Sequence, residues 1–361
     1  MRITYQMFFS NPARLSDEEF YRKEMDLALL AEPLGFDGIW CVEHHFDSDY
    51  AMSPDNVLVL GYLAARTEKV TLTTGAVIVP WNDPLRVAEK ISVLDQLSGG
   101  RVQLGIGRGL AKIEYNLFGI DMAESRERFD EASAMILSAL EKGVISGDGP
   151  FYPQAEAPIR PGPRRDFNDR TVCIAMSPDS REQAADMGVA ISTFSQFPLE
   201  VHIQGFEEYR ARFQEKHGRP APPVTMSDQV YCSEDADECA ATAREYTARH
   251  LALALKHYKF DDAEHFRNLK GYQSYTAAAE QMAAAGQEAA SEGYYQTQLT
   301  GTPDQIVERI QHRREQIGEY HQNCGFSFAG LPHDKAEKSM RLFATEVLPR
   351  LEKLGLREPS A

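Results

Sequence analysis

The sequence predicts an α/β protein folded as a closed (β/α)8 barrel, the TIM-barrel architecture, with insertion segments. Three observations support this fold class. The length of 361 residues suits one barrel domain that spans the whole chain. Eight short strand-like segments alternate with helix-like ones, and repeated βα units indicate a parallel sheet. A doubly wound sheet is the competing architecture, but no G-x-G-x-x-G motif follows the first predicted strand.

The eight predicted strands share β-branched or aromatic residues and end at turn or capping residues. They cover residues 3–9, 36–43, 70–79, 101–107, 171–176, 189–195, 224–231 and 325–330. Local signals also mark the helices between them. Asp83-Pro84 and Thr302-Pro303 each place a capping residue before a proline at the first helical position, and Ser16 begins an S-x-x-E capping box.

Two segments interrupt the alternation. Residues 146–170 are rich in proline and glycine, which predicts an extended excursion. Residues 259–301 are long, polar and alanine-rich, and a segment of that size inside a compact domain is typical of an active-site lid or insertion. A surface helical hairpin without a functional role is the alternative for 259–301. The aromatic residues of this segment are Phe260, Phe266, Tyr272, Tyr275, Tyr294 and Tyr295.

The composition indicates a soluble globular protein, with 43% hydrophobic and 25% charged residues. A formal net charge of −16 disfavours partners such as nucleic acids and anionic membranes. No stretch approaches 18 apolar residues, and the first residues lack the pattern of a signal peptide. Five scattered cysteines fit free thiols in a reducing compartment, so we expect a cytoplasmic protein without a disulfide framework.

The triplet Glu43-His44-His45 ends the second predicted strand. In a barrel, catalytic groups lie at the carboxyl ends of the strands, and histidines there can act as acid, base or hydrogen-bond donor near neutral pH. Strand alternation places Glu43 and His45 on one face and His44 on the other, so the triplet is a poor chelator and no metal is predicted. We therefore expect a catalytic or binding role for His44 and His45, with structural histidines as the alternative.

Glycines also mark candidate site residues in the third and fourth predicted strands. Gly75-Ala76 lies within the third strand, where a glycine can allow close approach of a ligand, although a bulge is the plain alternative. Arg108 follows Gly107 at the end of the fourth strand. An arginine there is a natural phosphate partner, or else a surface side chain bonded to loop carbonyls.

The fifth strand leads into a helix at Met176-Ser177-Pro178-Asp179-Ser180. Ser177 suits the N-cap position, and the hydroxyl of Ser180 lies one turn on, which favours an anion site at the positive end of the helix dipole. An ordinary cap is the alternative, and Asp179 would repel a phosphate unless it points away. Arg108 and this turn could together hold one phosphate over the barrel mouth.

At these residues the sequence resembles the bacterial luciferase-like flavin-dependent monooxygenases. The resemblance covers most of the chain except residues 259–301. It rests on six stretches: GFDGIWCVEHHFD (35–47), TTGAVIVPWNDPLRVAEKISVLDQLSGGRVQLGIGRG (73–109), FGIDMAESRERFDE (118–131), IAMSPDS (174–180), GTPDQIVERI (301–310) and ATEVLPRL (344–351).

The resemblance implies a two-component monooxygenase. Reduced FMN (FMNH2), supplied by a separate NAD(P)H:flavin reductase, would react with O2 to give a flavin C4a-peroxide that oxygenates a small organic substrate. A cis peptide at Gly75-Ala76 would lie under the flavin ring. Arg108 and the turn with Met176, Ser177 and Ser180 would hold the phosphate. His44 would act near the reactive flavin atoms with His45 beside it.

The resemblance also implies a homodimer that uses the second and third helices, here predicted at 54–66 and 84–97. Two departures point to a non-luminescent member, because Gly107 replaces the reactive cysteine of true luciferases and Met176 replaces their glutamate. An F420-dependent hydride-transfer enzyme and a non-catalytic flavin-binding protein stay open as alternatives. The apolar residues around the barrel mouth suggest an apolar or aromatic substrate, while hydroxylation, Baeyer–Villiger insertion and oxidative elimination are not distinguished.

Overall fold

The computed structural model describes residues 1–260, 266, 267, 272, 276, 280, 284 and 286–358. Eight parallel strands form a closed ring, in which each strand pairs with the next and the last pairs with the first. In ring order they are β1 (Ile3–Met7), β2 (Gly38–Cys41), β5 (Thr71–Thr74), β7 (Val102–Gly107), β10 (Thr171–Ile174), β11 (Ala190–Phe194), β12 (Val224–Cys232) and β14 (Tyr320–Gly325). This confirms the predicted (β/α)8 barrel.

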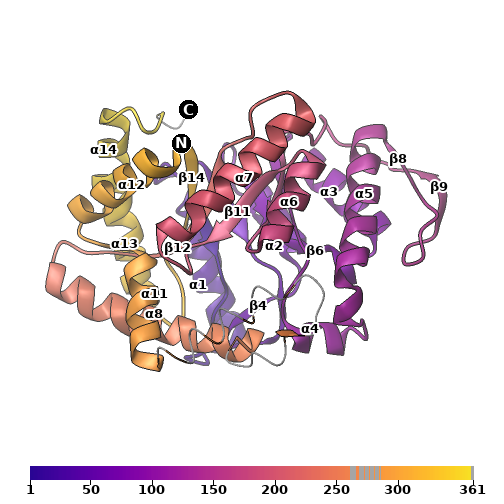
Figure 1. Cartoon of the computed structure of the whole chain (residues 1–361). Helices are drawn as coiled ribbons and strands as arrows, with labels where there is room; N and C mark the ends of the chain where they lie inside the picture. Colours follow the sequence, from indigo (N-terminus) through magenta and orange to yellow (C-terminus); the bar gives the residue numbers. More distant parts are fainter. Residues whose placement is uncertain are drawn as a thin grey trace.

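Helices surround the ring, and the two chain ends lie together on one side (Figure 1). The amino group of Met1 bonds to the carbonyl of Leu356 over 2.7 Å. The helices are α1 (Asp17–Leu29), α2 (Asn56–Ala64), α3 (Pro84–Leu97), α4 (Lys112–Leu117), α5 (Ser125–Lys142), α6 (Pro178–Met187), α7 (Leu199–His217), α8 (Ala236–Tyr258), α11 (Gln287–Thr297), α12 (Pro303–Ile317), α13 (His333–Leu342) and α14 (Leu348–Lys353).

Several short strands pair with barrel strands or form hairpins outside the ring. β6 (Val77–Ile78) pairs with β7 beyond the end of β5, and β13 (Leu299–Gly301) pairs with β12. Two antiparallel hairpins lie outside the ring. One is β3 (His44–Asp47) with β4 (Ala51–Ser53), and the other is β8 (Val144–Gly147) with β9 (Gln154–Pro158). The second hairpin opens the excursion predicted at 146–170.

The predicted helix starts are confirmed. The carboxylate of Asp83 accepts the backbone N–H of Arg86, and Thr302 forms a reciprocal capping box with Gln305. The hydroxyl of Ser16 accepts the N–H of Glu19. Each cap satisfies backbone donors that the first helical turn leaves unpaired.

The prediction for the eighth strand was wrong. The strand runs over Tyr320–Gly325, whereas Phe326 and Phe328 belong to the loop that follows it and pack in the core. The true strand reads as polar because its inward amides bond inside the barrel. Gln322 donates to the carboxylate of Asp228 over 2.6 Å, and Arg313 completes that buried pair with two bonds of 2.7 and 2.8 Å.

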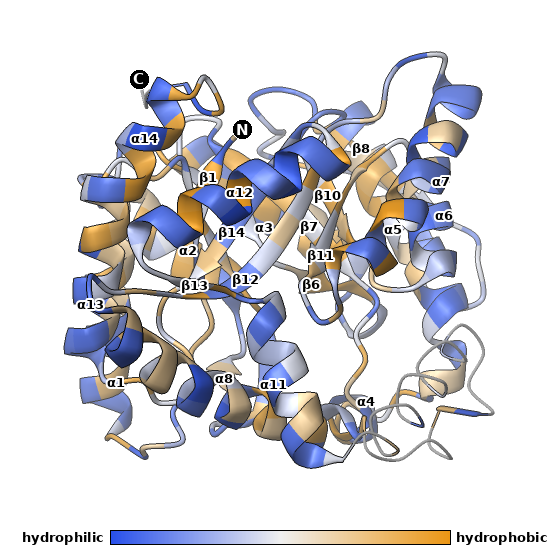
Figure 2. Ribbon diagram, turned by 60° about the vertical axis from the view of Figure 1, so that its left-hand side comes forward, coloured by the Kyte–Doolittle hydropathy of each residue, from blue (hydrophilic) through white to orange (hydrophobic). Residues whose placement is uncertain are grey.

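Apolar side chains fill the space between the strands and the inner faces of the helices, and hydrophilic residues are prominent on many of the surrounding helices (Figure 2). All five cysteines are free thiols and buried. Among the described residues, no helix has both the length and the apolar character needed to cross a bilayer. Of the aromatic residues predicted to matter in 259–301, Tyr275 lies outside the described residues, while Phe260, Phe266 and Tyr272 are buried.

Candidate functional site

A cavity of about 360 Å³ opens at the carboxyl ends of the barrel strands, a size typical of small-molecule sites. Seven of the eight predicted site residues line it. They come from several strand ends that are far apart in the sequence, and they are His44, Gly75, Ala76, Arg108, Met176, Ser177 and Ser180. The barrel therefore brings the predicted cofactor-binding residues and His44 to one place.

The peptide bond between Gly75 and Ala76 is cis. The side-chain amide of Asn56 donates to the Ala76 carbonyl over 3.0 Å and to the Cys41 carbonyl over 3.2 Å, so this buried asparagine ties the bond to β2. A Cβ atom added at Gly75 would lie 2.7 Å from the Trp40 ring. Asn56 escaped the sequence analysis because it reads as an ordinary residue at a helix start.

Gly107 lies beside Ala76 in the lining of the cavity. A Cβ atom at Gly107 would stand 3.1 Å from Ile78 and 3.4 Å from the Cβ of Ala76, so a side chain there would fill space beside the cis peptide.

The predicted anion site has the expected parts. The hydroxyl of Ser177 accepts the N–H of Ser180 over 3.3 Å, and the hydroxyl of Ser180 accepts the N–H of Ser177 over 3.0 Å, a reciprocal capping box at the start of α6. Asp179 is mostly exposed and lies 3.9 Å from Arg126. The guanidinium of Arg126 therefore offsets part of the repulsion expected from Asp179 at this turn.

Arg108 is held in place by two tyrosines. The Tyr272 ring lies 4.0 Å from the guanidinium carbon, a cation–π contact. The Tyr272 hydroxyl donates to the carbonyl of Gly109 over 2.8 Å, and the Tyr115 hydroxyl donates to the carbonyl of Arg108. A residue of the predicted insertion thus covers the predicted phosphate arginine.

Met176 turns its sulfur toward β11. The sulfur accepts hydrogen bonds from the Thr193 hydroxyl at 3.1 Å and the Phe194 N–H at 3.2 Å. Because the side chain is engaged there, a contact from Met176 to a phosphate would use its backbone.

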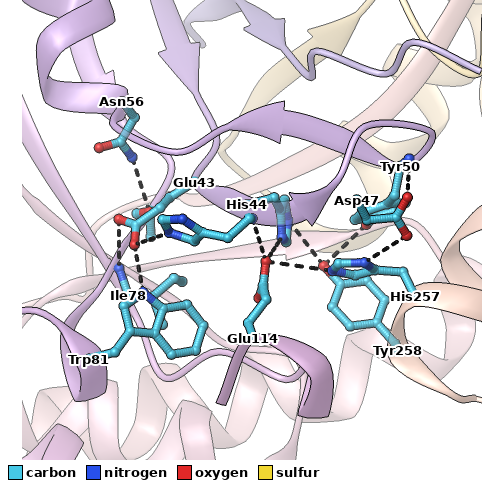
Figure 3. Close-up of polar contacts among 12 residues, drawn as sticks. Glu43, His44, Asp47, Tyr50, Asn56, Ile78, Trp81, Glu114, His257 and Tyr258 are labelled. Atoms are coloured by element: carbon cyan, nitrogen blue, oxygen red, sulfur yellow. Dashed lines mark hydrogen bonds and ion pairs between the residues drawn. The ribbon is translucent and has the colours of Figure 1, made fainter. Parts of the chain in front are cut away.

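His44 is bonded to a buried carboxylate (Figure 3). Its Nδ1 lies 3.1 Å from Oε1 of Glu114, and the same oxygen accepts the backbone N–H of His45 over 2.8 Å. Burial opposes ionisation of Glu114, but the imidazoles of His44 and His257 outweigh it and lower its pKa to about 2. Glu114 is thus a carboxylate across the neutral pH range.

His257 lies behind this pair, fully buried between two acids. Its Nδ1 lies 3.2 Å from Asp47 and its Nε2 lies 3.7 Å from Oε1 of Glu114. Burial lowers the pKa of His257, yet the bonds and charges of Asp47 and Glu114 raise it overall. The hydrogen bond from His257 also lowers the pKa of Asp47. The two carboxylates therefore favour the protonated form of His257.

The side chains of His44, Glu114 and His257 have donor atoms within 4.8 Å of one another, which is the donor set of some metal centres. Here, however, Nδ1 of His44 and Oε1 of Glu114 share a hydrogen bond, and His257 is bonded to Asp47. A metal ion would have to displace both bonds, so the arrangement suits proton sharing better than metal binding.

His45, the eighth predicted site residue, is not among the residues that line the cavity. Its Nε2 is 3.3 Å from Glu43, and its ring packs against Trp81 and Phe118. The reason is strand alternation, which sends neighbouring side chains to opposite faces. The geometry assigns His45 to the support of the site.

Glu43 is the centre of that support. Its carboxylate accepts hydrogen bonds from the Ile78 N–H at 3.2 Å, the Trp81 indole at 2.8 Å and the Asn82 amide at 3.0 Å. Glu43 thereby fixes the chain just after the cis peptide. The sequence analysis missed this role, and it also missed Glu114 and His257, because these residues meet only through the fold.

The comparisons with known proteins now decide the family. Residues 1–320 match the family model for luciferase-like monooxygenases. The chain belongs to the luciferase-like monooxygenase family. It is therefore an enzyme of the flavin-dependent monooxygenase class, as the sequence resemblance predicted.

Relatives of this family member align over nearly its whole length. An alkanal monooxygenase alpha chain of Photobacterium leiognathi is 26% identical over 372 residues, which is 98% of this chain and 99% of that one. The solved monooxygenase RslO1 from Streptomyces bottropensis is 26% identical, with a TM-score of 0.81 over 97% of this chain and 99% of that one.

Two more distant structures share the fold alone. The oxygenating constituent of 3,6-diketocamphane monooxygenase of Pseudomonas putida, solved with FMN, is 19% identical with a TM-score of 0.74, over 97% of this chain and 98% of that one. An F420-dependent secondary alcohol dehydrogenase is 17% identical with a TM-score of 0.71, over 99% of each chain. Flavin and deazaflavin enzymes thus both use this architecture.

Proposed function

We propose that this protein is a two-component monooxygenase that binds FMNH2 and uses O2 to oxygenate a small, mainly apolar or aromatic molecule. The observation that carries the proposal is the shared cavity of the Gly75–Ala76 cis peptide, Arg108 and His44. When bound there, reduced flavin would supply the two electrons that activate O2.

The residues of the cavity fit such a cofactor. Gly75, Ala76 and Gly107 give the cavity a lining with little side-chain bulk beside the cis peptide, which leaves room for a ring system in front of them. Arg108 and the amino end of α6, with Ser177 and Ser180, offer a cation and a helix dipole to a phosphate. We propose that these residues hold the phosphate of FMN, with a backbone contact from Met176.

His44 is the proposed acid–base group. Glu114 orients its ring and stabilises the imidazolium that forms when His44 takes up a proton. His45 would act indirectly, because its bond to Glu43 helps to fix the segment after the cis peptide. No described cysteine can serve as a reactive thiol in the cavity, since Gly107 stands at the position expected for one and the five thiols are buried.

The proposed substrate class is inferred from the residues that line the cavity. Aromatic and aliphatic side chains form much of the cavity lining, which favours an apolar or aromatic body. They include Phe8, Val42, Tyr50, Phe194, Phe197 and Leu251. We propose that α11, the described helix of the predicted insertion, covers this space, since its residues Ala290, Gly293 and Tyr294 line the cavity.

We also propose a homodimer through α2 and α3, which pack side by side. Together they expose apolar side chains that a monomer would leave in water: Leu58 (73% exposed), Tyr62 (50%), Val93 (40%) and Leu97 (68%). An exposed apolar patch of this kind is typical of a protein interface.

One experiment separates this function from the F420 alternative. The protein is titrated anaerobically with photoreduced FMN and, in parallel, with reduced F420, and each complex is then mixed with 18O2 and a panel of aromatic substrates. We expect FMNH2 to bind, and mass spectrometry to find one 18O atom per product, with or without a flavin reductase present. Binding of F420 alone, or binding of FMNH2 without oxygenation of any substrate, would contradict the proposal.

A further inference from the structure

The basic nitrogen of His44 faces a tyrosine hydroxyl. The hydroxyl of Tyr258 lies 3.2 Å from Nε2 of His44, and the Tyr50 hydroxyl donates to the Tyr258 oxygen over 3.1 Å (Figure 3). Tyr258 is the last residue of α8 and lines the cavity together with His44. The sequence analysis did not single out Tyr258 or Tyr50.

The direction of each bond follows from the chemistry of the partners. Ionised Glu114 can only accept, so Nδ1 of His44 carries a proton. In the neutral ring Nε2 is then an acceptor, and Tyr258 must donate to it. Since the Tyr258 oxygen receives the proton of Tyr50, the three bonds all run toward Glu114.

This chain is held rigidly. The Tyr50 ring stacks on His257 with the centroids 4.3 Å apart and the planes at 18°, and its edge meets Phe8. His257 in turn is bonded to Asp47 on the β3–β4 hairpin. Tyr50 therefore cannot turn away from Tyr258 without loss of a buried aromatic contact.

We propose that Tyr258 is the relay through which His44 exchanges protons with a ligand in the cavity. The inference rests on the proposed function. In the basic direction, a ligand O–H gives its proton to the Tyr258 oxygen while the Tyr258 proton passes to Nε2 of His44. The products are a ligand anion, an unchanged tyrosine and an imidazolium paired with Glu114, so that charge and protons balance. The acidic direction is the reverse.

The relay requires the hydroxyl of Tyr258, whereas a direct role of His44 does not. If His44 acted alone, the Tyr258 hydroxyl would only block its Nε2, and removal of that hydroxyl would leave turnover unchanged or raise it. If Tyr258 is the relay, removal of one oxygen atom interrupts the proton path while the ring and the packing stay in place.

The first test is kinetic. We expect Tyr258→Phe to lower kcat by about 10²-fold, the usual size of an acid–base contribution, while the Kd for FMNH2 changes by less than about twofold. The matched control is Tyr209→Phe, which removes a buried hydroxyl bonded to the Val189 carbonyl far from the cavity. Adding Tyr258→Phe to His44→Ala should cost nothing further, because both act on one proton path. An unchanged kcat for Tyr258→Phe, or losses that multiply, would overturn the relay.

The second test needs no flavin. The 15N resonance of His44 Nε2 is measured in 15N-histidine-labelled protein and assigned with His44→Ala. Tyr258→Phe removes the donor to this atom, so its resonance should move to higher shift, whereas Tyr209→Phe should leave it in place. An unmoved resonance would overturn the relay. Absence of oxygenation in the unmodified protein would contradict the proposed function alone, since the resonance still reports the bond.

Discussion

Glu114 binds the ring of His44 at Nδ1 across 3.1 Å and thereby selects which nitrogen of the imidazole is basic. The carboxylate comes from α4, whereas His44 follows β2, so the pairing depends on the closed barrel. The same carboxylate oxygen fixes the backbone at His45. A single buried acid therefore orients the proposed acid–base group in both ring and main chain.

Loss of this imidazole should affect turnover far more than cofactor binding. We expect His44→Ala to lower kcat by about 10²-fold or more, because a positioned acid–base group contributes that much. The Kd for FMNH2 should change little, since the proposed phosphate contacts are at Arg108 and the start of α6. Stopped-flow turnover and anaerobic titration measure the two quantities. His312→Ala, which removes an exposed histidine on α12, is the control, and a His44→Ala enzyme with normal kcat would exclude the acid–base role.

At Arg108, in contrast, we expect the substitution to affect cofactor binding more than turnover. Arg108→Ala should weaken FMNH2 binding by about 1.5–3 kcal/mol, the range for a hydrogen bond to a charged group. Part of that loss would come from the Tyr272 ring, which then has no cation to stack on. Anaerobic fluorescence titration gives the Kd. Arg14→Ala, whose side chain is 80% exposed, serves as the comparison, and equal Kd values for both variants would remove Arg108 from the cofactor site.

The buried acid–imidazole cluster makes stability depend on pH in two directions. The pKa of Glu114 falls from 4.5 to about 2 on folding, so its contribution is present above pH 4.5 and is lost as the pH falls toward 2. The pKa of His257 rises from 6.5, so its contribution is present below pH 6.5 and is lost at higher pH. Both contributions are complete between about pH 4.5 and 6.5.

Urea unfolding across this pH range tests the cluster. The free energy of unfolding should fall both below about pH 4.5 and above about pH 6.5. On the acid side, protonation of Glu114 should lower it by about 3 kcal/mol. His257→Gln should flatten the fall above pH 6.5 and also weaken the acid limb, because His257 contributes to the lowered pKa values of Glu114 and Asp47. A flat profile above pH 6.5 in the unmodified protein would show that His257 is not held as an imidazolium.

The apolar face of α2 and α3 predicts the association state. Leu58→Glu together with Leu97→Glu places two charges on this face, and we expect the variant to run as a monomer where the unmodified protein runs as a dimer. Sedimentation velocity measures the mass, and circular dichroism checks that the fold survives. Two glutamates at the exposed Val201 and Leu354 provide the matched control. A monomeric unmodified protein would exclude the predicted interface.

The barrel was predictable because its signals are local. Caps such as Asp83 and Thr302, and glycines after helices, mark boundaries that the chain itself enforces. The eighth strand was predicted wrongly because the signals that mark it are not local. Gln322 and Asn323 read as surface residues, yet they are buried and bonded to Asp228 and Ser227 of the neighbouring strand. A polar strand of this kind is hidden until its partner strand is in place.

In the candidate site, too, some residues could be predicted from the sequence and others only from the fold. His44, Arg108 and Ser177 lie at strand or helix ends that the sequence marks, so they could be found without the fold. Glu114 and Tyr258 lie on helices that meet His44 only in three dimensions, about 70 and 214 positions along the chain. Strand alternation already separated His45 from His44 in the sequence, but the contacts of His45 with Glu43 and Trp81 needed the fold.

One helix, α8, supplies His250, Leu251 and Ala254 to the cavity wall and ends at Tyr258 beside His44. Selection for a bulkier or smaller compound by exchange of Leu251 or Ala254 would therefore disturb the same helix that fixes the hydroxyl. Engineering that aims to widen the range of accepted compounds without slowing the reaction should begin at Phe194 and Phe197, which line the same cavity but do not belong to α8.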